Sequence, residues 1–195
     1  MKALSLSKIA LAIALAVPAL AAAESNWVVG PGSANARLDF QITIPRVLYF
    51  QVGPGAFATN DTTVQLMSTS VPAATLGGGT VNFAPGTVPV RVVGNNGQVT
   101  IIATTLGALQ SDLLATDTIS FTKIAGSTSD AAIPHPTFVD GGASAAVNVT
   151  LSSGKVTNRT ADWSFTYAND ASIPPGIYGG VNSRNSRVTY TAALP

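Results

Sequence analysis

Few residues of the chain could carry out acid–base or nucleophilic chemistry, and they are scattered. The single histidine, His135, stands between two prolines in the stretch Ile133-Pro134-His135-Pro136, and we expect an exposed position in a stiff loop. The chain has no cysteine, so thiol catalysis, cysteine-based zinc sites and disulfides are excluded. It also has no G-x-S-x-G sequence, the turn that presents an activated serine in many hydrolases.

The carboxylates form no pattern that indicates a catalytic or metal site. A glycosidase needs two of them facing each other across a cleft, and most of the nine acids stand beside Asn, Gly, Ser or Thr, where turn and capping roles explain them. The pairs Asp112/Asp117 and Asp162/Asp170 do not match the spacing of a calcium-binding EF-hand loop. Residues 77–79 (GGG) and 53–55 (GPG) lack the Lys-Ser/Thr of a phosphate-binding loop. We therefore predict no catalytic residue, no metal and no cofactor.

Composition narrows the class of protein further. Charged residues make up 10% of the 195 residues, against roughly 25% in an ordinary soluble domain. Hydrophobic residues make up 46%, which is enough for a sizeable core. The ten Lys and Arg residues form no cluster, so we expect no nucleic-acid partner.

Residues 1–23 have the three parts of a secretory signal peptide. Lys2 and Lys8 supply the positive region, residues 9–17 form a short apolar run, and Ala21-Ala22-Ala23 provides small residues for cleavage. We predict export by the Sec route to the periplasm and then to the cell surface or medium, with no membrane insertion after the signal is removed. Loss of the two lysines changes the formal net charge from +1 to −1.

The rest of the sequence has the alternation of β-strands. Residues 37–44 (RLDFQITI) alternate strictly between polar and apolar, which predicts a strand with one buried face. Residues 47–52, 62–67, 80–83 and 119–123 are further strand candidates. Trp163, Phe165 and Tyr167 alternate with Ser and Thr and are expected to form a core face. Leucines at 106, 109 and 113 predict one or two helical turns.

Two hairpins are expected from turn sequences. Residues 88–93 and 98–104 flank Gly94-Asn95-Asn96-Gly97, and residues 145–151 and 155 onward flank Ser152-Ser153-Gly154. Many short strands separated by turns predict an all-β fold, with residues 36–195 forming a single antiparallel immunoglobulin-like β-sandwich.

Residues 24–35 (ESNWVVGPGSAN) are expected to form an N-terminal tail. Its apolar cluster, Trp27, Val28 and Val29, needs a docking place on an exported protein. The tail either covers its own sheet or acts as a donor strand that pairs with the open edge of another subunit.

The C-terminal region resembles bacterial secreted pilin-like subunits of the fimbrial type. The turn Pro174-Pro175-Gly176-Ile177-Tyr178 is followed by the strand Val188-Thr189-Tyr190-Thr191-Ala192, similar to the "P-x-G-x-Y" turn and final "V-T-Y-T" strand of that family. The resemblance implies immunoglobulin-like subunits joined by strand donation, with a periplasmic chaperone and an outer-membrane usher as partners. It places Val188 and Tyr190 with Trp27, Val28 and Val29 among the residues of subunit assembly.

The sequence therefore predicts a non-catalytic structural or adhesive subunit of a surface fibre or biofilm matrix. Self-association or association with other fibre subunits, by strand addition, is the expected partner interaction. The alternative is a secreted β-sandwich module that binds carbohydrate or protein, with Trp27 and the tyrosines as a sugar platform. An enzyme is the third hypothesis.

Overall fold

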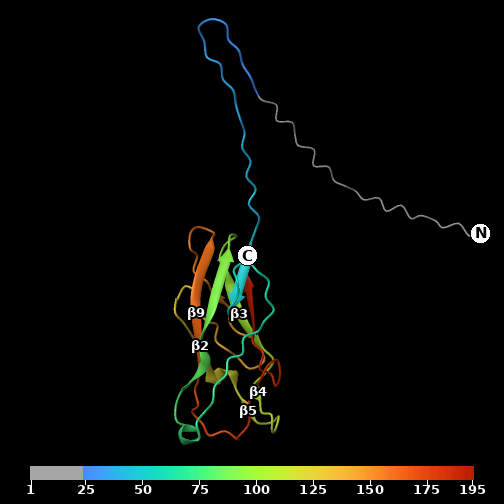
Figure 1. Ribbon diagram of the computed structural model, residues 1–195, viewed down its shortest axis with the longest axis vertical. Helices are drawn as coiled ribbons and strands as arrows, with labels where there is room; N and C mark the ends of the chain where they lie inside the picture. Colours follow the sequence, from blue (N-terminus) through green and yellow to red (C-terminus); the bar gives the residue numbers. More distant parts are fainter. Residues whose placement is uncertain (1–23) are drawn as a thin grey trace, which may run out of the picture. The chain divides into compact units, whose positions relative to one another are not determined.

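The computed structural model describes residues 24–195 and divides them into two units, which are considered separately. The signal peptide predicted for residues 1–23 lies outside the described residues. The second unit, residues 45–195, contains every strand found among the described residues (Figure 1). None of the helices among the described residues is long and apolar enough to cross a membrane.

The second unit is an all-β, antiparallel, sandwich-like fold, as predicted. One four-stranded sheet has the order β1 (Leu48–Val52), β2 (Val81–Gly94), β9 (Thr157–Tyr167) and β6 (Ile124–Thr128). The second sheet has the order β10 (Thr189–Ala193), β3 (Thr100–Thr105) and β7 (Gly142–Ala143), and β8 (Val147–Asn148) also pairs with β3. The short strands β4 (Leu109–Gln110) and β5 (Thr118–Ile119) form a separate pair. Two short 3-10 helices, η1 (Ala73–Thr75) and η2 (Phe121–Lys123), complete the elements.

The core lies between the two larger sheets. From Val88 onward in β2 and from Ala161 onward in β9, every second residue is buried, because successive side chains of a strand point to opposite faces. Trp163 is fully buried and donates a hydrogen bond from Nε1 to the carbonyl oxygen of Ile133 at 3.2 Å. The core face predicted for Trp163, Phe165 and Tyr167 is confirmed.

Both expected hairpins are wrong as pairings, although both turns are present. Strand β2 pairs with β1 and β9, whereas β3, which follows the turn at 94–97, pairs with β10, β7 and β8. Strands β8 and β9 likewise belong to different sheets. The physical reason is that β2 carries an apolar face (Val88, Val90, Val92) and β3 another (Ile101 and Ala103, continued by Val99 just before the strand), and facing sheets bury both faces at once.

Four other predictions of secondary structure differ from the structure. The strand predicted for residues 119–123 is absent: only Ile119 belongs to a strand, β5, and residues 121–123 form η2, where the Ser120 side chain accepts a hydrogen bond from the backbone N–H of Thr122. Residues 106–115 form β4 and turns rather than a helical segment, and Leu106 and Leu113 are exposed. Residues 62–67 form no strand, although the adjoining Ser68 bridges to Ala84 of β2. The strand predicted for residues 37–44 is absent, and its supposed buried face is open: Leu38, Phe40, Ile42 and Ile44 are 74–85% exposed.

Candidate functional site

The second unit has an open groove of about 480 Å³ that is lined mainly by apolar side chains. One wall is formed by β1 and residues 63–67, with Phe50, Val52, Val64 and Leu66 among its side chains. The opposite wall is formed by residues 178–190 and includes Val188 and Tyr190 of the predicted assembly set. The floor consists of core side chains, namely Phe83, Val88, Leu109, Phe121, Ile124, Phe138 and Phe165.

The groove lies between two strands that each have an unpaired edge. Strand β1 pairs with β2 and strand β10 pairs with β3, and each is the outermost strand of its sheet. An edge strand presents unpaired backbone N–H and C=O groups, which accept an added strand. The groove therefore combines a largely apolar lining with two backbone edges, the arrangement that a further β-strand would complete.

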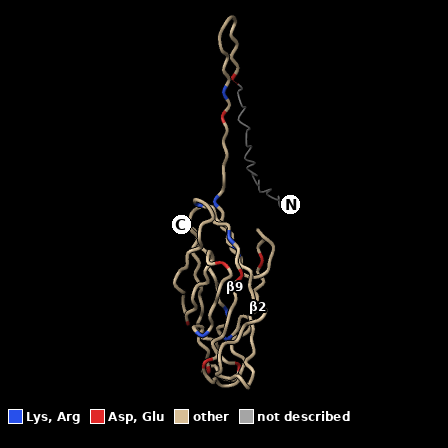
Figure 2. Tube along the Cα trace, turned by 90° about the vertical axis from the view of Figure 1, so that its left-hand side faces the viewer, with Lys and Arg blue, Asp and Glu red and all other residues tan. Residues whose placement is uncertain are grey.

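Charge plays a small part in this groove. Of the residues that line it, one, Arg187, is charged. Figure 2 shows how sparsely Lys, Arg, Asp and Glu are distributed along the strands of the second unit. A segment that filled the groove would consequently be recognised by apolar burial and backbone pairing.

The first unit supplies a segment with matching character. In residues 37–44 the apolar side chains Leu38, Phe40, Ile42 and Ile44 alternate with Arg37, Asp39, Gln41 and Thr43. The four apolar side chains are exposed, and a monomer rarely leaves such a contiguous set without a use. A strand with this alternation buries one face and leaves the other in water, so it suits a groove that opens to solvent.

The tail residues singled out from the sequence lie in the same unit but lack this pattern. Trp27 and Val29 are 88% and 80% exposed, and Val28 is also exposed. The three are consecutive, so in a strand they would point to both faces. Within this unit Arg37 donates two hydrogen bonds of 2.8 Å to Glu24, and this ion pair lowers the pKa of the Glu24 carboxyl.

Beneath the groove, His135 occupies a position that the sequence did not indicate. It is partly buried rather than exposed, and its Nε2 lies 2.8 Å from the hydroxyl of Tyr190. The rings of Phe138, Trp163 and Phe165 surround the imidazole at 4.8–5.1 Å between centroids. Burial lowers the pKa of His135 to about 4 and raises the pKa of Tyr190, so both groups are neutral at pH 7.

The glycine at 126 makes room for this histidine. A Cβ atom added to Gly126 in β6 would lie 2.2–2.5 Å from three atoms of the His135 ring. The signal that could have located His135 is thus a glycine inside a strand, which often marks a close approach. With Tyr190 as its polar neighbour and no carboxylate bonded to it, the imidazole serves as a core side chain.

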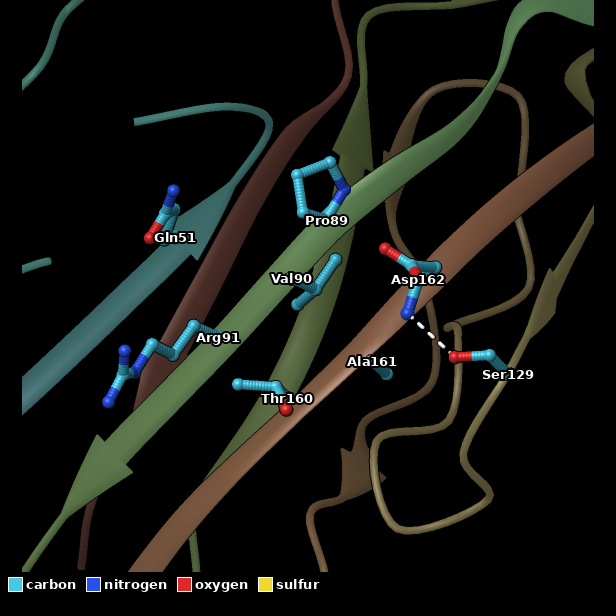
Figure 3. A pocket seen from close by; sticks show the side chains of 8 residues that line it. All are labelled: Gln51, Pro89, Val90, Arg91, Ser129, Thr160, Ala161 and Asp162. Atoms are coloured by element: carbon cyan, nitrogen blue, oxygen red, sulfur yellow. Dashed lines mark hydrogen bonds between the residues drawn. The ribbon is translucent and has the colours of Figure 1, made fainter. Parts of the chain in front are cut away.

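A second, shallower pocket of about 330 Å³ lies on the outer face of β2 and β9 (Figure 3). Its polar side chains are Gln51, Arg91, Ser129, Thr160 and Asp162. The guanidinium carbon of Arg91 lies 3.9 Å from the centroid of the Phe57 ring, a cation–π contact, and its Nε is buried without a hydrogen-bond partner. The hydroxyl of Ser129 accepts a hydrogen bond of 2.8 Å from the backbone of Asp162.

Among residues 24–195, no group of three or more His, Asp or Glu side chains is placed to hold a metal ion. No family model, curated protein or solved structure matches the chain.

Proposed function

We propose that the protein is an exported, non-catalytic structural or adhesive subunit of a surface fibre or matrix, and that it assembles by strand addition between copies. Residues 37–44 of one copy are the donor strand, and the groove between β1 and β10 of another copy is the acceptor. This moves the donor role from residues 24–35 to the segment that follows them. The observation that carries the proposal is the complementarity of an open apolar groove and an exposed alternating segment in one chain.

Burial of the apolar face of the donor segment is the main favourable contribution to such an association. Burying a Leu, Ile or Phe side chain contributes about 1.5–3 kcal/mol, so four of them contribute roughly 6–12 kcal/mol. Pairing of the donor backbone with the open edges of β1 and β10 adds directional hydrogen bonds. Association costs about 4–15 kcal/mol in lost translational and rotational freedom, so backbone pairing and side-chain burial are both needed to offset it.

The donor segment of one copy binds the groove of another copy, so the two surfaces in contact are different. The interaction is therefore head-to-tail, and it leaves a free groove and a free donor segment in every pair. Heterologous contacts of this kind generate open filaments when the rotation does not close a ring. The resemblance of residues 172–192 to pilin-like subunits supports the same proposal, including an immunoglobulin-like type of sandwich. Export through the Sec route and delivery by a periplasmic chaperone and an outer-membrane usher belong to the proposal as well.

The test compares two variants of the donor segment, residues 37–44, that add the same charge to its opposite faces. Phe40→Asp places a carboxylate on the apolar face, and Gln41→Asp places one on the polar face. We expect the mature chain and Gln41→Asp to form oligomers in size-exclusion chromatography and filaments in electron microscopy, whereas Phe40→Asp stays monomeric. Equal assembly of the two variants would contradict the proposal, and so would a monomeric mature chain.

The outer pocket favours one alternative, a secreted module that binds carbohydrate. Arg91 and Asp162 lie diagonally across β2 and β9, since Arg91 pairs with Thr160 and Pro89 pairs with Asp162. They form no ion pair with each other, so a donor and an acceptor remain for the hydroxyls of a sugar. A glycan array probed with Phe40→Asp protein tests this, with Arg91→Gln as the variant that should lose any signal. Absence of signal counts against the alternative.

A further inference from the structure

The side chain of Asn95, in the turn between β2 and β3, binds the backbone of residues 45–47, which directly follow the donor segment. The side-chain Oδ1 of Asn95 accepts a hydrogen bond of 2.8 Å from the backbone N–H of Val47, and its Nδ2 donates one of 2.7 Å to the carbonyl oxygen of Pro45. The backbone N–H of Asn95 also donates to the carbonyl oxygen of Val47 at 3.4 Å. One side-chain amide thus holds a carbonyl and an N–H that are two residues apart.

These bonds require an extended backbone at residues 45–47. In a β-strand the groups of residues i and i+2 point to the same side, and a single amide reaches both. Asn95 directly follows Gly94, the residue that pairs with Leu48 at the start of β1. We call the two side-chain hydrogen bonds of Asn95 the clamp. The clamp keeps residues 45–47 extended, so the chain continues the direction of β1 for three residues before Leu48.

Two further hydrogen bonds hold the same end of the second unit. The guanidinium of Arg46 donates to the carbonyl oxygen of Pro195, and Nδ2 of Asn96 donates to that oxygen at 3.1 Å. The end of β10 and the start of β1 consequently lie side by side at one end of this unit (Figure 1).

The reach of the chain then decides which groove its donor segment is able to fill. Three extended residues cover about 10 Å, at roughly 3.3 Å per residue. For the donor segment to reach the groove of its own chain, the residues before Pro45 would have to reverse direction. This needs a turn of at least two residues and about three further residues to cover the same 10 Å in the opposite direction. These five residues are residues 40–44. Phe40, Ile42 and Ile44 would then lie in the reversing segment, and of the four apolar residues Leu38 alone could enter the groove.

We propose that Asn95 is a positioning residue that keeps the donor segment out of the groove of its own chain and so reserves that groove for another copy. This inference rests on the proposed function. Without the clamp, a tight turn at residues 45–46 would lay residues 37–44 directly against β1, and the groove would be filled within one molecule. Such self-insertion would be favoured, because a tethered segment has an effective concentration in the millimolar range.

The first test removes the clamp. Asn95→Ala deletes both side-chain bonds to residues 45–47, and Asn96→Ala is the matched control, because it alters the same turn and leaves these bonds in place. Monomers whose groove is filled by their own residues 37–44 are called closed monomers. We expect Asn95→Ala to raise their fraction by on the order of tenfold, because the loss of two ordinary hydrogen bonds changes an equilibrium by about that factor. This fraction is measured by chromatography over a dilution series, together with binding of a labelled peptide of residues 36–46, which closed monomers should reject.

The second test keeps the clamp and supplies the missing length. Six Gly/Ser residues inserted between Ile44 and Pro45 exceed the five residues that the return path needs, so this variant should also form closed monomers that reject the peptide. It decides the matter if Asn95→Ala fails to fold. The inference is overturned if the insertion variant, or folded Asn95→Ala, polymerises as the mature chain does. A different result would refute the proposed function itself: the unmodified mature chain would neither assemble nor bind the peptide.

Discussion

The buried environment of His135 predicts that the folded chain loses stability in mild acid. Burial lowers the pKa of this imidazole to about 4, and its unfolded value is 6.5. The unfolded chain therefore binds more protons than the folded chain between these values, and the free energy of unfolding falls as the pH falls from 6.5 towards 4. At one pKa unit per 1.36 kcal/mol, the loss between pH 7 and pH 4.5 is about 2 kcal/mol.

Three carboxyls with a lowered pKa titrate below this pH interval. The carboxyls of Glu24, Asp61 and Asp170 have a lowered pKa because each accepts hydrogen bonds, so the stability that they contribute is lost only as the pH falls below their ordinary values of 4.5 and 3.8. The interval from pH 7 to pH 4.5 thus reports mainly on His135.

The assay is urea unfolding at pH 7, 5.5 and 4.5, followed by tryptophan fluorescence, on the Phe40→Asp protein so that assembly does not add to stability. The comparison is the same protein with His135→Gln, which removes the titrating group. We expect the unfolding free energy to drop in the His135 protein and to stay nearly level in the variant. A level profile in both proteins, or an equal drop in both, would refute the reasoning.

Three further predictions follow from the packing and from the groove. Gly126→Ala should reduce the free energy of unfolding by about 1–3 kcal/mol, because its Cβ would overlap the His135 ring; an unchanged urea midpoint would contradict this packing. Trp163→Leu should cost about 3 kcal/mol or more, since it empties part of the core and leaves the carbonyl of Ile133 without its donor, and a loss under about 1 kcal/mol in the same assay would count against that account. Assembly should survive an increase in NaCl from 0.05 to 0.5 M, because one charged residue lines the groove; a tenfold weaker association, measured by sedimentation, would indicate electrostatic recognition instead.

Local patterns in the sequence predicted the fold class and the positions of turns, but not the pairing of strands. The alternation in β2 and β9 and the turn residues at 94–97 were sufficient to place these elements. Whether strands on either side of a turn pair with each other or face each other across the core depends on residues far away in sequence. The partners of β2 are β1 and β9, and no local signal distinguishes them from β3.

The same limit explains the two largest differences at the candidate site. Alternation in residues 37–44 indicates that one face is to be covered, and it carries no information on which chain covers it. The surroundings of His135 are set by Gly126, Trp163 and Tyr190, which come from three strands that meet only in the folded state. Val188 and Tyr190 were identified from a resemblance, and the structure places both in the groove wall.

The most direct test of strand addition is cross-linking between copies, which the absence of cysteine makes clean. An acceptor chain carries Val64→Cys in the groove wall, and donor chains carry one cysteine each: Leu38→Cys or Ile42→Cys on the apolar face, Asp39→Cys or Gln41→Cys on the polar face. After co-assembly and treatment with a short thiol cross-linker, mass spectrometry of isotope-labelled mixtures identifies links between different chains. Strand addition predicts links from positions 38 and 42 and few from 39 and 41. Equal yields from all four positions, or links confined to single chains, would contradict it.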